Sequence, residues 1–312
     1  MDRNELFQRA AAIGKAKADA AIAARQDADR RRADALNRVA QPLALQARVV
    51  GVEALPAAHA ASTGFLVAAG DSWFDYPFHD VLKDLHDDYG YNVESTSHKG
   101  DPMESMAYLG GQIDGLSRMF DKVRAQGATP IAVLLSGGGD DIAGREFGML
   151  LNNKDSAIGG WNADVLKGVI EDRIAAAYVA MLNAIDSLSN QYAGRTLPIL
   201  IHGYDYPVPD GRGFLGGWGP LPGPWLQPGF REKNFADLDE TKALMRLAID
   251  QFNAMLTELV TAPALAHVKY VDLRGTLKTD DTYKDWWANE LHPTEQGFKA
   301  VTDRFAQALQ NL

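Results

Sequence analysis

From residue 63 onward, short and fully apolar runs alternate with longer stretches whose apolar residues recur at helical spacing. Fully apolar runs are typical of strands buried on both faces of a parallel sheet, and the intervening stretches of helices that cover it. We expect strands at 65–69, 91–95, 130–135, 197–201 and 268–271. We expect helices at 81–85, 103–126, 163–188, 238–259 and 294–309. The pattern predicts a three-layer α/β/α sandwich with a central parallel sheet of about five strands.

The first 60 residues follow a different pattern. Residues 2–40 are rich in Ala, Arg, Asp and Gln and contain no proline, which favours one long helix. Large apolar residues are sparse there, so this helix can bury little surface by itself. We therefore predict an Ala-rich helical extension with its linker over residues 1–60 and one larger domain over 61–312. The helix could pack on that domain or pair with a second copy of the chain.

Composition limits the classes of protein that fit. The chain has 312 residues, 46% of them hydrophobic, and a net charge of -10. Residues 1–50 hold 10 basic and 6 acidic side chains, so their net charge is positive and the net negative charge lies in the remainder of the chain. Because phosphate binding needs clustered cations, this acidic body argues against nucleic acid as a partner.

The sequence also bears on the cellular compartment of the protein and on its redox chemistry. No run of about 18 uncharged apolar residues occurs, so we expect no membrane-spanning helix. The N-terminal sequence lacks the apolar core of a secretory signal, and cytoplasmic residence is the default expectation. There is no cysteine, which excludes disulfides, thiolate metal sites and a cysteine nucleophile.

Polar or glycine-rich breaks follow four of the expected strands. They are Gly70-Asp71-Ser72, Ser97-His98-Lys99-Gly100, Gly138-Gly139-Asp140-Asp141 and His202-Gly203-Tyr204-Asp205. In parallel sheets, ligands bind beyond the carboxyl ends of the strands. We therefore expect a functional site where these four breaks converge.

Two residues supply candidate chemistry for such a site. Ser72 stands after a buried strand, where its hydroxyl and its backbone N–H can face the same cavity, as acyl transfer requires. His292, followed by Pro293, lies on a loop before the last helix and could fold back to the strand ends. Ser72 could instead act only as a helix cap, because serine is favoured in that position.

In order and in placement, these blocks resemble the SGNH (GDSL-like) hydrolase family over residues 63–312. The Gly-Asp-Ser block ends at Ser72, and the glycine of the second block corresponds to Gly100. The third block, Gly-x-Asn-Asp, corresponds to Gly138-Gly139-Asp140-Asp141, and the last, Asp-x-x-His-Pro, to 289–293. The resemblance implies the α/β/α fold, which is flavodoxin-like, and a serine esterase or lipase.

Applied to this chain, the resemblance gives each matching residue a role. Ser72 would form an acyl-enzyme with a small-molecule ester, and His292 would be its general base. The backbone N–H groups of Ser72 and Gly100, together with Asp140, would form the oxyanion hole. Asn289 would hold the histidine. No cofactor and no metal are needed for this reaction.

This chain departs from the family at two positions. Asp140 replaces an asparagine that donates to the oxyanion, and an ionised carboxylate can only accept hydrogen bonds. Asn289 replaces the aspartate that orients the histidine. Three interpretations follow. The enzyme could be a Ser–His dyad in which a backbone carbonyl or a nearby acid, such as Glu290 or Asp285, holds His292. The chain could be a weakened or inactive binding or scaffold protein. Finally, Asp71, Asp140 and Asp141 could hold a metal that assists ester cleavage.

The segment 204–235 is unusual because it holds seven glycines and six prolines among aromatic residues. Long loops inside compact domains are usually functional. We expect a lid or pocket wall, or an interface through which the chain forms a homo-oligomer, as residues 1–60 also could. The aromatic and histidine residues expected near the substrate are Trp73, Phe74, Tyr76, His98, Tyr204, Trp218 and Trp225.

Overall fold

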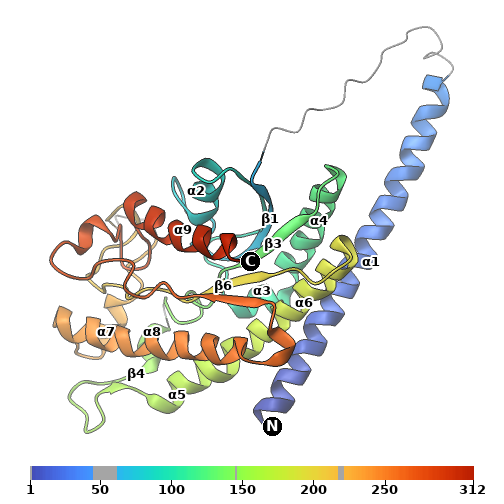
Figure 1. Ribbon diagram of the computed structural model, residues 1–312. Helices are drawn as coiled ribbons and strands as arrows, with labels where there is room; N and C mark the ends of the chain where they lie inside the picture. Colours follow the sequence, from blue (N-terminus) through green and yellow to red (C-terminus); the bar gives the residue numbers. More distant parts are fainter. Residues whose placement is uncertain (1, 45–61, 145, 217–220) are drawn as a thin grey trace.

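The computed structural model describes residues 2–44, 62–144, 146–216 and 221–312. Its centre is a parallel sheet with the strand order β2-β1-β3-β6-β7 (Figure 1). The strands are β1 (Gly64–Ala69), β2 (Tyr91–Ser95), β3 (Pro130–Leu135), β6 (Ile199–His202) and β7 (Val268–Val271). All five lie where the sequence predicts strands, although β2 and β7 contain polar residues, and the parallel five-stranded sheet is confirmed.

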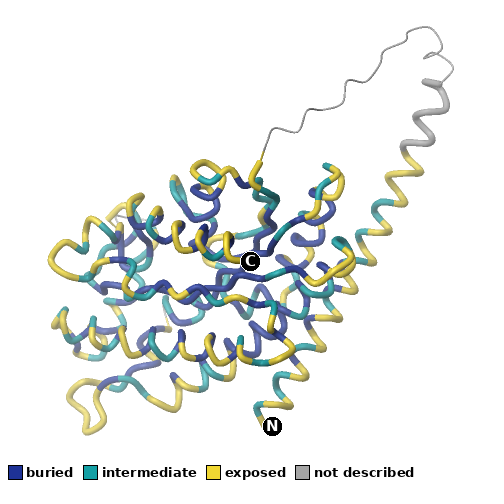
Figure 2. The backbone as a smooth tube through the Cα atoms, in the orientation of Figure 1, coloured by how far each residue is buried: buried dark blue, intermediate teal, exposed yellow. Residues whose placement is uncertain are grey.

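Helices cover both faces of this sheet. Helices α2 (Val81–Asp87) and α9 (Glu295–Gln310) pack together on one face, whereas α4 (Gly111–Ala125), α6 (Ala175–Ala193) and α8 (Leu238–Val260) lie on the other. The central strands β1, β3 and β6 are buried along most of their length (Figure 2). This is the predicted three-layer α/β/α sandwich. Within the described residues, no helix is long and apolar enough to cross a membrane.

Two of the predicted helices are interrupted. The stretch 103–126 breaks at Gly110, whose φ of 84° separates α3 (Met103–Leu109) from α4. Only glycine adopts this left-handed backbone without strain. The stretch 163–188 begins as α5 (Ala163–Lys167), widens into the π-helical segment η3 (Gly168–Ile174), and continues as α6.

Short elements that the pattern does not reveal decorate this frame. They are the antiparallel pair β4 (Leu151–Asn152) and β5 (Gly160–Trp161), the helix α7 (Gln227–Glu232), and the 3₁₀ turns η2 (Phe147–Leu150), η4 (Phe214–Gly216), η5 (Pro263–Leu265) and η6 (Tyr283–Asp285). Strands of two residues are too short to show a period in the sequence.

The long N-terminal helix α1 (Arg3–Ala44) packs its first half on α6 and α4. The contact is close because Gly14 has no side chain: a Cβ there would lie 1.9 Å from the carbonyl oxygen of Ala180. Farther along the helix, Arg25 Nη2 lies 2.6 Å from a carboxylate oxygen of Asp121 in α4. Figure 1 shows the far end of α1 extending away from the sheet domain.

The strand order also locates the crevice. Strand β1 lies between β2 and β3, and the chain leaves the ends of β1 and β3 toward opposite faces of the sheet. Loops that diverge in this way leave a crevice at the carboxyl ends of the two strands. Ser72 follows β1, and Gly138 follows β3 with a φ of 98°.

Candidate active site

Asp71 fixes the turn that carries Ser72. Its Oδ1 accepts hydrogen bonds from the backbone N–H of Trp73, at 3.0 Å, and from the hydroxyl of Ser136, at 2.7 Å. The phenol of Tyr204 donates to Oδ2. Because Ser136 follows β3 and Tyr204 follows β6, the buried Asp71 carboxylate joins the ends of three strands. It is therefore a structural anchor beneath Ser72.

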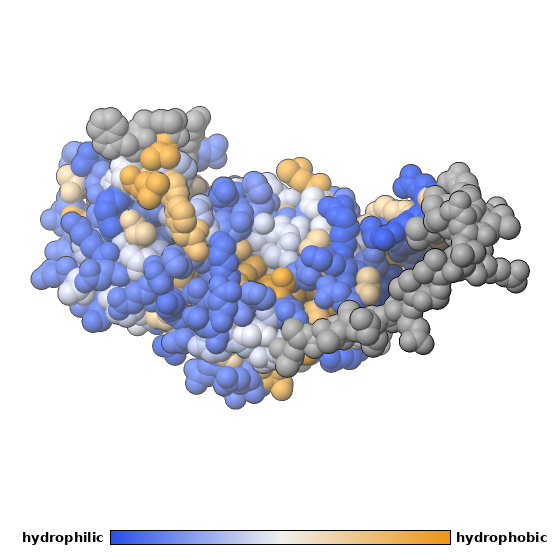
Figure 3. Space-filling model, turned by 90° about the horizontal axis from the view of Figure 1, so that it is seen from above, coloured by the Kyte–Doolittle hydropathy of each residue, from blue (hydrophilic) through white to orange (hydrophobic). Residues whose placement is uncertain are grey.

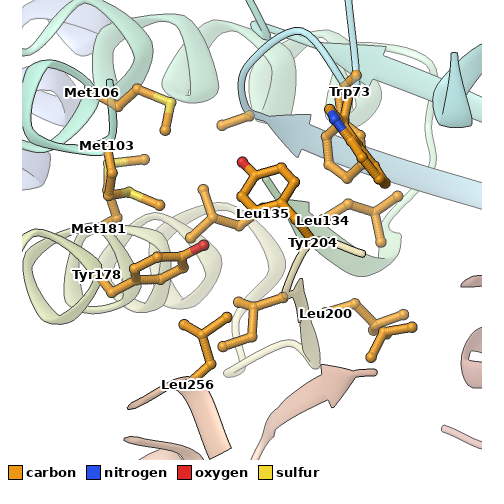
Figure 4. Packing of buried hydrophobic residues seen from close by; sticks show 14 of the residues in the cluster. Trp73, Met103, Met106, Leu134, Leu135, Tyr178, Met181, Leu200, Tyr204 and Leu256 are labelled. Atoms are coloured by element: carbon orange, nitrogen blue, oxygen red, sulfur yellow. The ribbon is translucent and has the colours of Figure 1, made fainter. Parts of the chain in front are cut away.

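His202 belongs to the same buried network. Its Nδ1 donates to the carbonyl of Gly203, at 2.9 Å, and its Nε2 lies 2.7 Å from Ser136 Oγ. Complete burial lowers the pKa of this imidazole. The structure therefore places His202 in the interior beneath the site. Figure 4 shows the neighbouring Trp73 and Tyr204 within the packed core.

The loop that carries Gly100 is held against the end of β1. The side chain of Gln112, in α4, accepts from the N–H of Gly70 and donates to its carbonyl, both at 2.9 Å. The same amide donates to Asp101 at 2.7 Å. This buried glutamine links the Ser72 turn to the turn after β2 and so positions Gly100.

Ser72 and His292, which are 220 positions apart in the sequence, are in direct contact. The Nε2 atom of His292 lies 2.7 Å from Ser72 Oγ. On the other side of the ring, Nδ1 lies 3.0 Å from Asn289 Oδ1. The same oxygen accepts from the backbone N–H groups of Leu291 and His292, each at 3.0 Å. Because an amide oxygen can only accept, Nδ1 carries the proton and Nε2 presents a lone pair to Ser72.

Tyr76 completes this arrangement. Asn289 Nδ2 donates to the Tyr76 hydroxyl at 2.9 Å, and the Tyr76 ring stacks on the His292 imidazole with 4.3 Å between ring centroids. Burial lowers the pKa of His292 from its ordinary 6.5 to about 3 and raises that of Tyr76 to about 12. Above about pH 3 the imidazole is therefore neutral and able to accept a proton.

A cavity of about 460 Å³ opens over Ser72 and His292. Its wall includes Gly100 and Asp140 together with Lys99 and aromatic side chains of Tyr76, Phe214 and Trp225. A second cavity, of about 60 Å³, also reaches Ser72 and Asp140. Seen from above, the surface is mostly hydrophilic, and apolar side chains reach it in several separate places (Figure 3).

Asp140 has an unusual electrostatic environment. Its carboxyl group makes no hydrogen bond within the described part of the chain, and it lines both cavities. Burial raises the pKa of its carboxyl group to about 8, and the neighbouring carboxylates of Asp71, Asp141 and Asp101 add to the effect. A buried carboxyl group close to like charges favours its neutral form. At neutral pH the Asp140 carboxyl group can therefore act as a hydrogen-bond donor.

Neither of the acids considered for orienting His292 does so in this structure. The buried Glu290 carboxylate accepts from the N–H groups of Gly211, Trp225, Leu226 and Gln227, at 2.6–3.0 Å. Asp285 is exposed, and among the described residues it makes hydrogen bonds only through its backbone. Glu290 instead fastens the segment 204–235, which supplies Phe214, Leu221 and Trp225 to the wall of the large cavity.

The arrangement of Asp71, Asp140 and Asp141 does not support the hypothesis that these three carboxylates hold a metal. Asp71 already accepts three hydrogen bonds, and Asp141 accepts from the N–H groups of Met103, at 2.6 Å, and Glu104, at 3.3 Å. In the described part of the chain, no group of three or more acidic or histidine side chains is placed to hold a metal ion.

The aromatic and histidine residues expected near the substrate lie in different parts of the structure. Tyr76 and Trp225 line the large cavity, and Trp73 and Tyr204 line the small one. Phe74 packs in the core against Phe305 rather than facing either cavity. The side chain of His98 is 69% exposed and lies 3.2 Å from Asp101. Trp218 lies outside the described residues.

Sequence reasoning did not identify the wall of the small cavity that α8 provides. Met245, Ala248, Ile249 and Phe252 of this helix all line it. Their spacing is that of any helix face packed on a core, so the sequence carries no signal that this face borders a cavity. The roles of Ser136 and Gln112 were also missed, because isolated polar residues in apolar stretches show their partners only in three dimensions.

A scan against protein-family models finds no match for this chain, and a search of curated proteins finds none either. Among solved structures, it is similar to the lipase Lip_vut3 from a goat rumen metagenome, with 14% identity, 79% of this chain and 97% of the other covered, and a TM-score of 0.47.

Two further solved structures are similar at the same level. A catalytic mutant of Axe2, an acetylxylan esterase from Geobacillus stearothermophilus, has 15% identity, coverage of 81% and 96%, and a TM-score of 0.42. LAE5, described as an alpha/beta hydrolase enzyme from the metagenome of Lake Arreo, has 15% identity, coverage of 80% and 96%, and a TM-score of 0.40.

Proposed function

We propose that this protein is a serine hydrolase of the SGNH type that cleaves carboxylic esters through an acyl-enzyme on Ser72. The observation that carries the proposal is the 2.7 Å contact between Ser72 Oγ and the unprotonated Nε2 of His292, at the carboxyl end of β1. A hydroxyl in contact with an oriented imidazole is the arrangement that nucleophilic catalysis by serine requires.

The reaction begins when Ser72 Oγ attacks the ester carbonyl while His292 Nε2 takes the hydroxyl proton. The tetrahedral intermediate collapses, and the imidazolium returns that proton to the departing alcohol. Water then attacks the acyl-enzyme and loses a proton to Nε2. The second tetrahedral intermediate collapses as the bond between the acyl carbon and Ser72 Oγ breaks, the imidazolium returns the proton to Ser72 Oγ, and the carboxylic acid leaves. Asn289 holds the ring in the tautomer that both half-reactions need.

The oxyanion of each intermediate needs donors, and three candidates border the large cavity. Two are the backbone N–H groups of Ser72 and Gly100. The third is the Asp140 carboxyl group, which donates in its neutral form. Because its pKa is raised to about 8, this form dominates at neutral pH. Removing one donor of an oxyanion hole typically costs about 10²–10³ in rate.

This proposed enzyme works without a carboxylate behind its histidine. A serine protease loses about 10⁴ in rate when its aspartate becomes asparagine, partly because the histidine takes the wrong tautomer. Here the orientation of Asn289 supports the right tautomer, so only the loss of charge remains. We therefore expect a working enzyme that is slow compared with one that has a full Ser-His-Asp triad.

Hydrolysis of 4-nitrophenyl acetate by the purified chain tests the proposal. We expect turnover that falls at least 10³-fold in Ser72→Ala and in His292→Gln. Ser156→Ala is the matched control, because Ser156 is exposed and lines neither cavity. Labelling by ethyl fluorophosphonate, located by peptide mass spectrometry, should fall on Ser72 alone.

Equal rates for the original chain and Ser72→Ala would overturn the proposal. In that case the alternative, a binding or scaffold protein with a vestigial site, would be favoured. Retained activity with loss of labelling would point to another nucleophile in the cavity.

A further inference from the structure

Two cavities meet at the proposed nucleophile. Both are lined by Ser72, Asp140 and Leu291, but they differ in size, at about 460 Å³ and 60 Å³. They also differ in their access to the base, because His292 lines only the large cavity. An ester bound at Ser72 therefore has two unequal spaces for its two halves.

The small cavity has an apolar interior. Helix α8 contributes Met245, Ala248, Ile249 and Phe252, all buried. Leu226 and Trp287 lie on its wall as well. A space with such walls favours hydrocarbon and offers little to a polar group.

The polar side chains on this wall are already engaged. Asp71 accepts from Trp73, Ser136 and Tyr204. Asp205 accepts from the N–H groups of Tyr206 and Gly275, at 2.8 Å, and of Leu277, at 2.6 Å. Asp140, at the junction with the large cavity, is the exception. Polar recognition is therefore confined to the junction, where the ester carbonyl would lie.

The position of His292 decides which half of the ester goes where. Its Nε2 must protonate the departing alcohol and then activate the water that replaces it. Both therefore approach from the side of the large cavity, which His292 lines. The acyl group stays on Ser72 during this exchange and needs a separate space. Among the cavities lined by the described residues, the small one offers such a space, because it borders Ser72 but not His292.

We propose that the small cavity binds the acyl group and restricts this enzyme to esters of short, unbranched acids of about two to four carbons. This inference rests on the serine hydrolase proposed above. A single water needs about 10–15 Å³ on the same measure of volume. A cavity of about 60 Å³ therefore holds only a few heavy atoms. Larger, aromatic alcohols fit the other cavity, whose wall includes Tyr76, Phe214 and Trp225.

A series of 4-nitrophenyl esters tests this restriction. We expect kcat/KM to fall at least tenfold from butyrate to octanoate, since one misfitting methylene in a pocket already costs about tenfold or more. Ala248→Leu should lower the ratio of butyrate to acetate kcat/KM at least tenfold by filling the cavity. Ile249→Ala should raise the ratio of hexanoate to butyrate kcat/KM about tenfold by enlarging it.

Matched controls lie on the exposed face of the same helix. Ala243→Leu repeats the change made at Ala248, and Leu247→Ala removes a side chain of the same size as that of Ile249. The side chains of Ala243 and Leu247 are exposed, so these variants should leave both ratios within twofold of the original. The enlarging variant keeps the test decisive if Ala248→Leu does not fold.

The outcomes distinguish a failure of the acyl restriction from a failure of the proposed serine hydrolase activity. Ser72-dependent hydrolysis in which octanoate is as good a substrate as butyrate would overturn the acyl restriction alone. So would chain-length ratios that neither Ala248→Leu nor Ile249→Ala changes. If no ester is hydrolysed and neither ethyl nor octyl fluorophosphonate labels Ser72, both proposals are overturned together.

Discussion

Asn289 faces His292 with its amide oxygen, which lies 3.0 Å from Nδ1. Two backbone N–H groups donate to that oxygen, and the amide nitrogen donates to Tyr76, so the amide cannot rotate without losing three hydrogen bonds. An asparagine fixed in this way orients the imidazole as an aspartate would, but it adds no negative charge. A triad aspartate both orients the histidine and stabilises its charged form, whereas Asn289 provides only the orientation.

Asn289→Asp supplies the missing charge. A carboxylate beside Nδ1 favours the imidazolium, so we expect the pKa of His292 to rise from about 3 toward its ordinary value. The turnover number for 4-nitrophenyl acetate should rise on the order of 10–100-fold at pH 7, because the charge stabilises the ion pair formed in the transition state. NMR titration of His292 and steady-state kinetics measure the two effects.

Asn289→Ala is the control for this gain, because it removes both the acceptor and the orientation and should lower the rate. A rise in the His292 pKa without any gain in rate would show that base strength does not limit turnover.

Asp140→Asn tests the neutral carboxyl group as an oxyanion donor. The pKa of Asp140 is raised, so its proton is present below about pH 8 and lost above it. We expect kcat of the original chain to fall as the pH rises through 8, while Asp140→Asn, whose amide donates at every pH, stays level to pH 9. At pH 7 the two rates should agree within about tenfold.

Urea unfolding of the original chain and of Asp140→Asn measures the protonation of Asp140 independently of catalysis. The folded protein holds a proton on Asp140 that the unfolded chain releases above about pH 4, so stability declines as the pH rises from there to about 8. Asp140→Asn should lack this part of the decline. Parallel pH profiles of rate for the two proteins would mean that Asp140 does not contact the oxyanion.

The sequence was sufficient to predict the sheet because its central strands β1, β3 and β6, which are buried on both faces, appear as largely apolar runs. Ser72 and His292 could be inferred because they stand at fixed places relative to those runs. The break at Gly110 could not, since one glycine in a helical pattern is equally compatible with a continuous helix.

The partner of His292 was harder to predict for a different reason. Glu290 and Asp285 are near His292 in the sequence, and an acid is the expected orienting group. Proximity in sequence does not show where a carboxylate points, and that of Glu290 is occupied by four backbone N–H groups. The small cavity was also invisible, because its walls are ordinary core residues of α8.

Glu290→Gln tests the structural role of that carboxylate. An amide offers one acceptor oxygen in place of two, so at least one buried N–H of the segment 204–235 loses its partner. We expect a loss of about 1–3 kcal/mol in the free energy of unfolding. The pH dependence of kcat should keep its shape, whereas a residue that orients His292 would change it. Chemical denaturation and a pH–rate profile measure these two quantities.

The packing of α1 on the sheet domain can be tested with a pair of glycines. A Cβ on Gly14 would lie 1.9 Å from the Ala180 carbonyl oxygen, whereas one on Gly168 would meet no atom within 4 Å. Gly14→Ala should therefore push α1 from α6 and destabilise the protein by about 1–3 kcal/mol. Gly168→Ala, at a helical φ of -60° and ψ of -36°, should stabilise it by about 0.4–1 kcal/mol, because the unfolded chain loses freedom. Equal stability of Gly14→Ala and the original chain in urea unfolding would show that α1 does not hold this contact in solution.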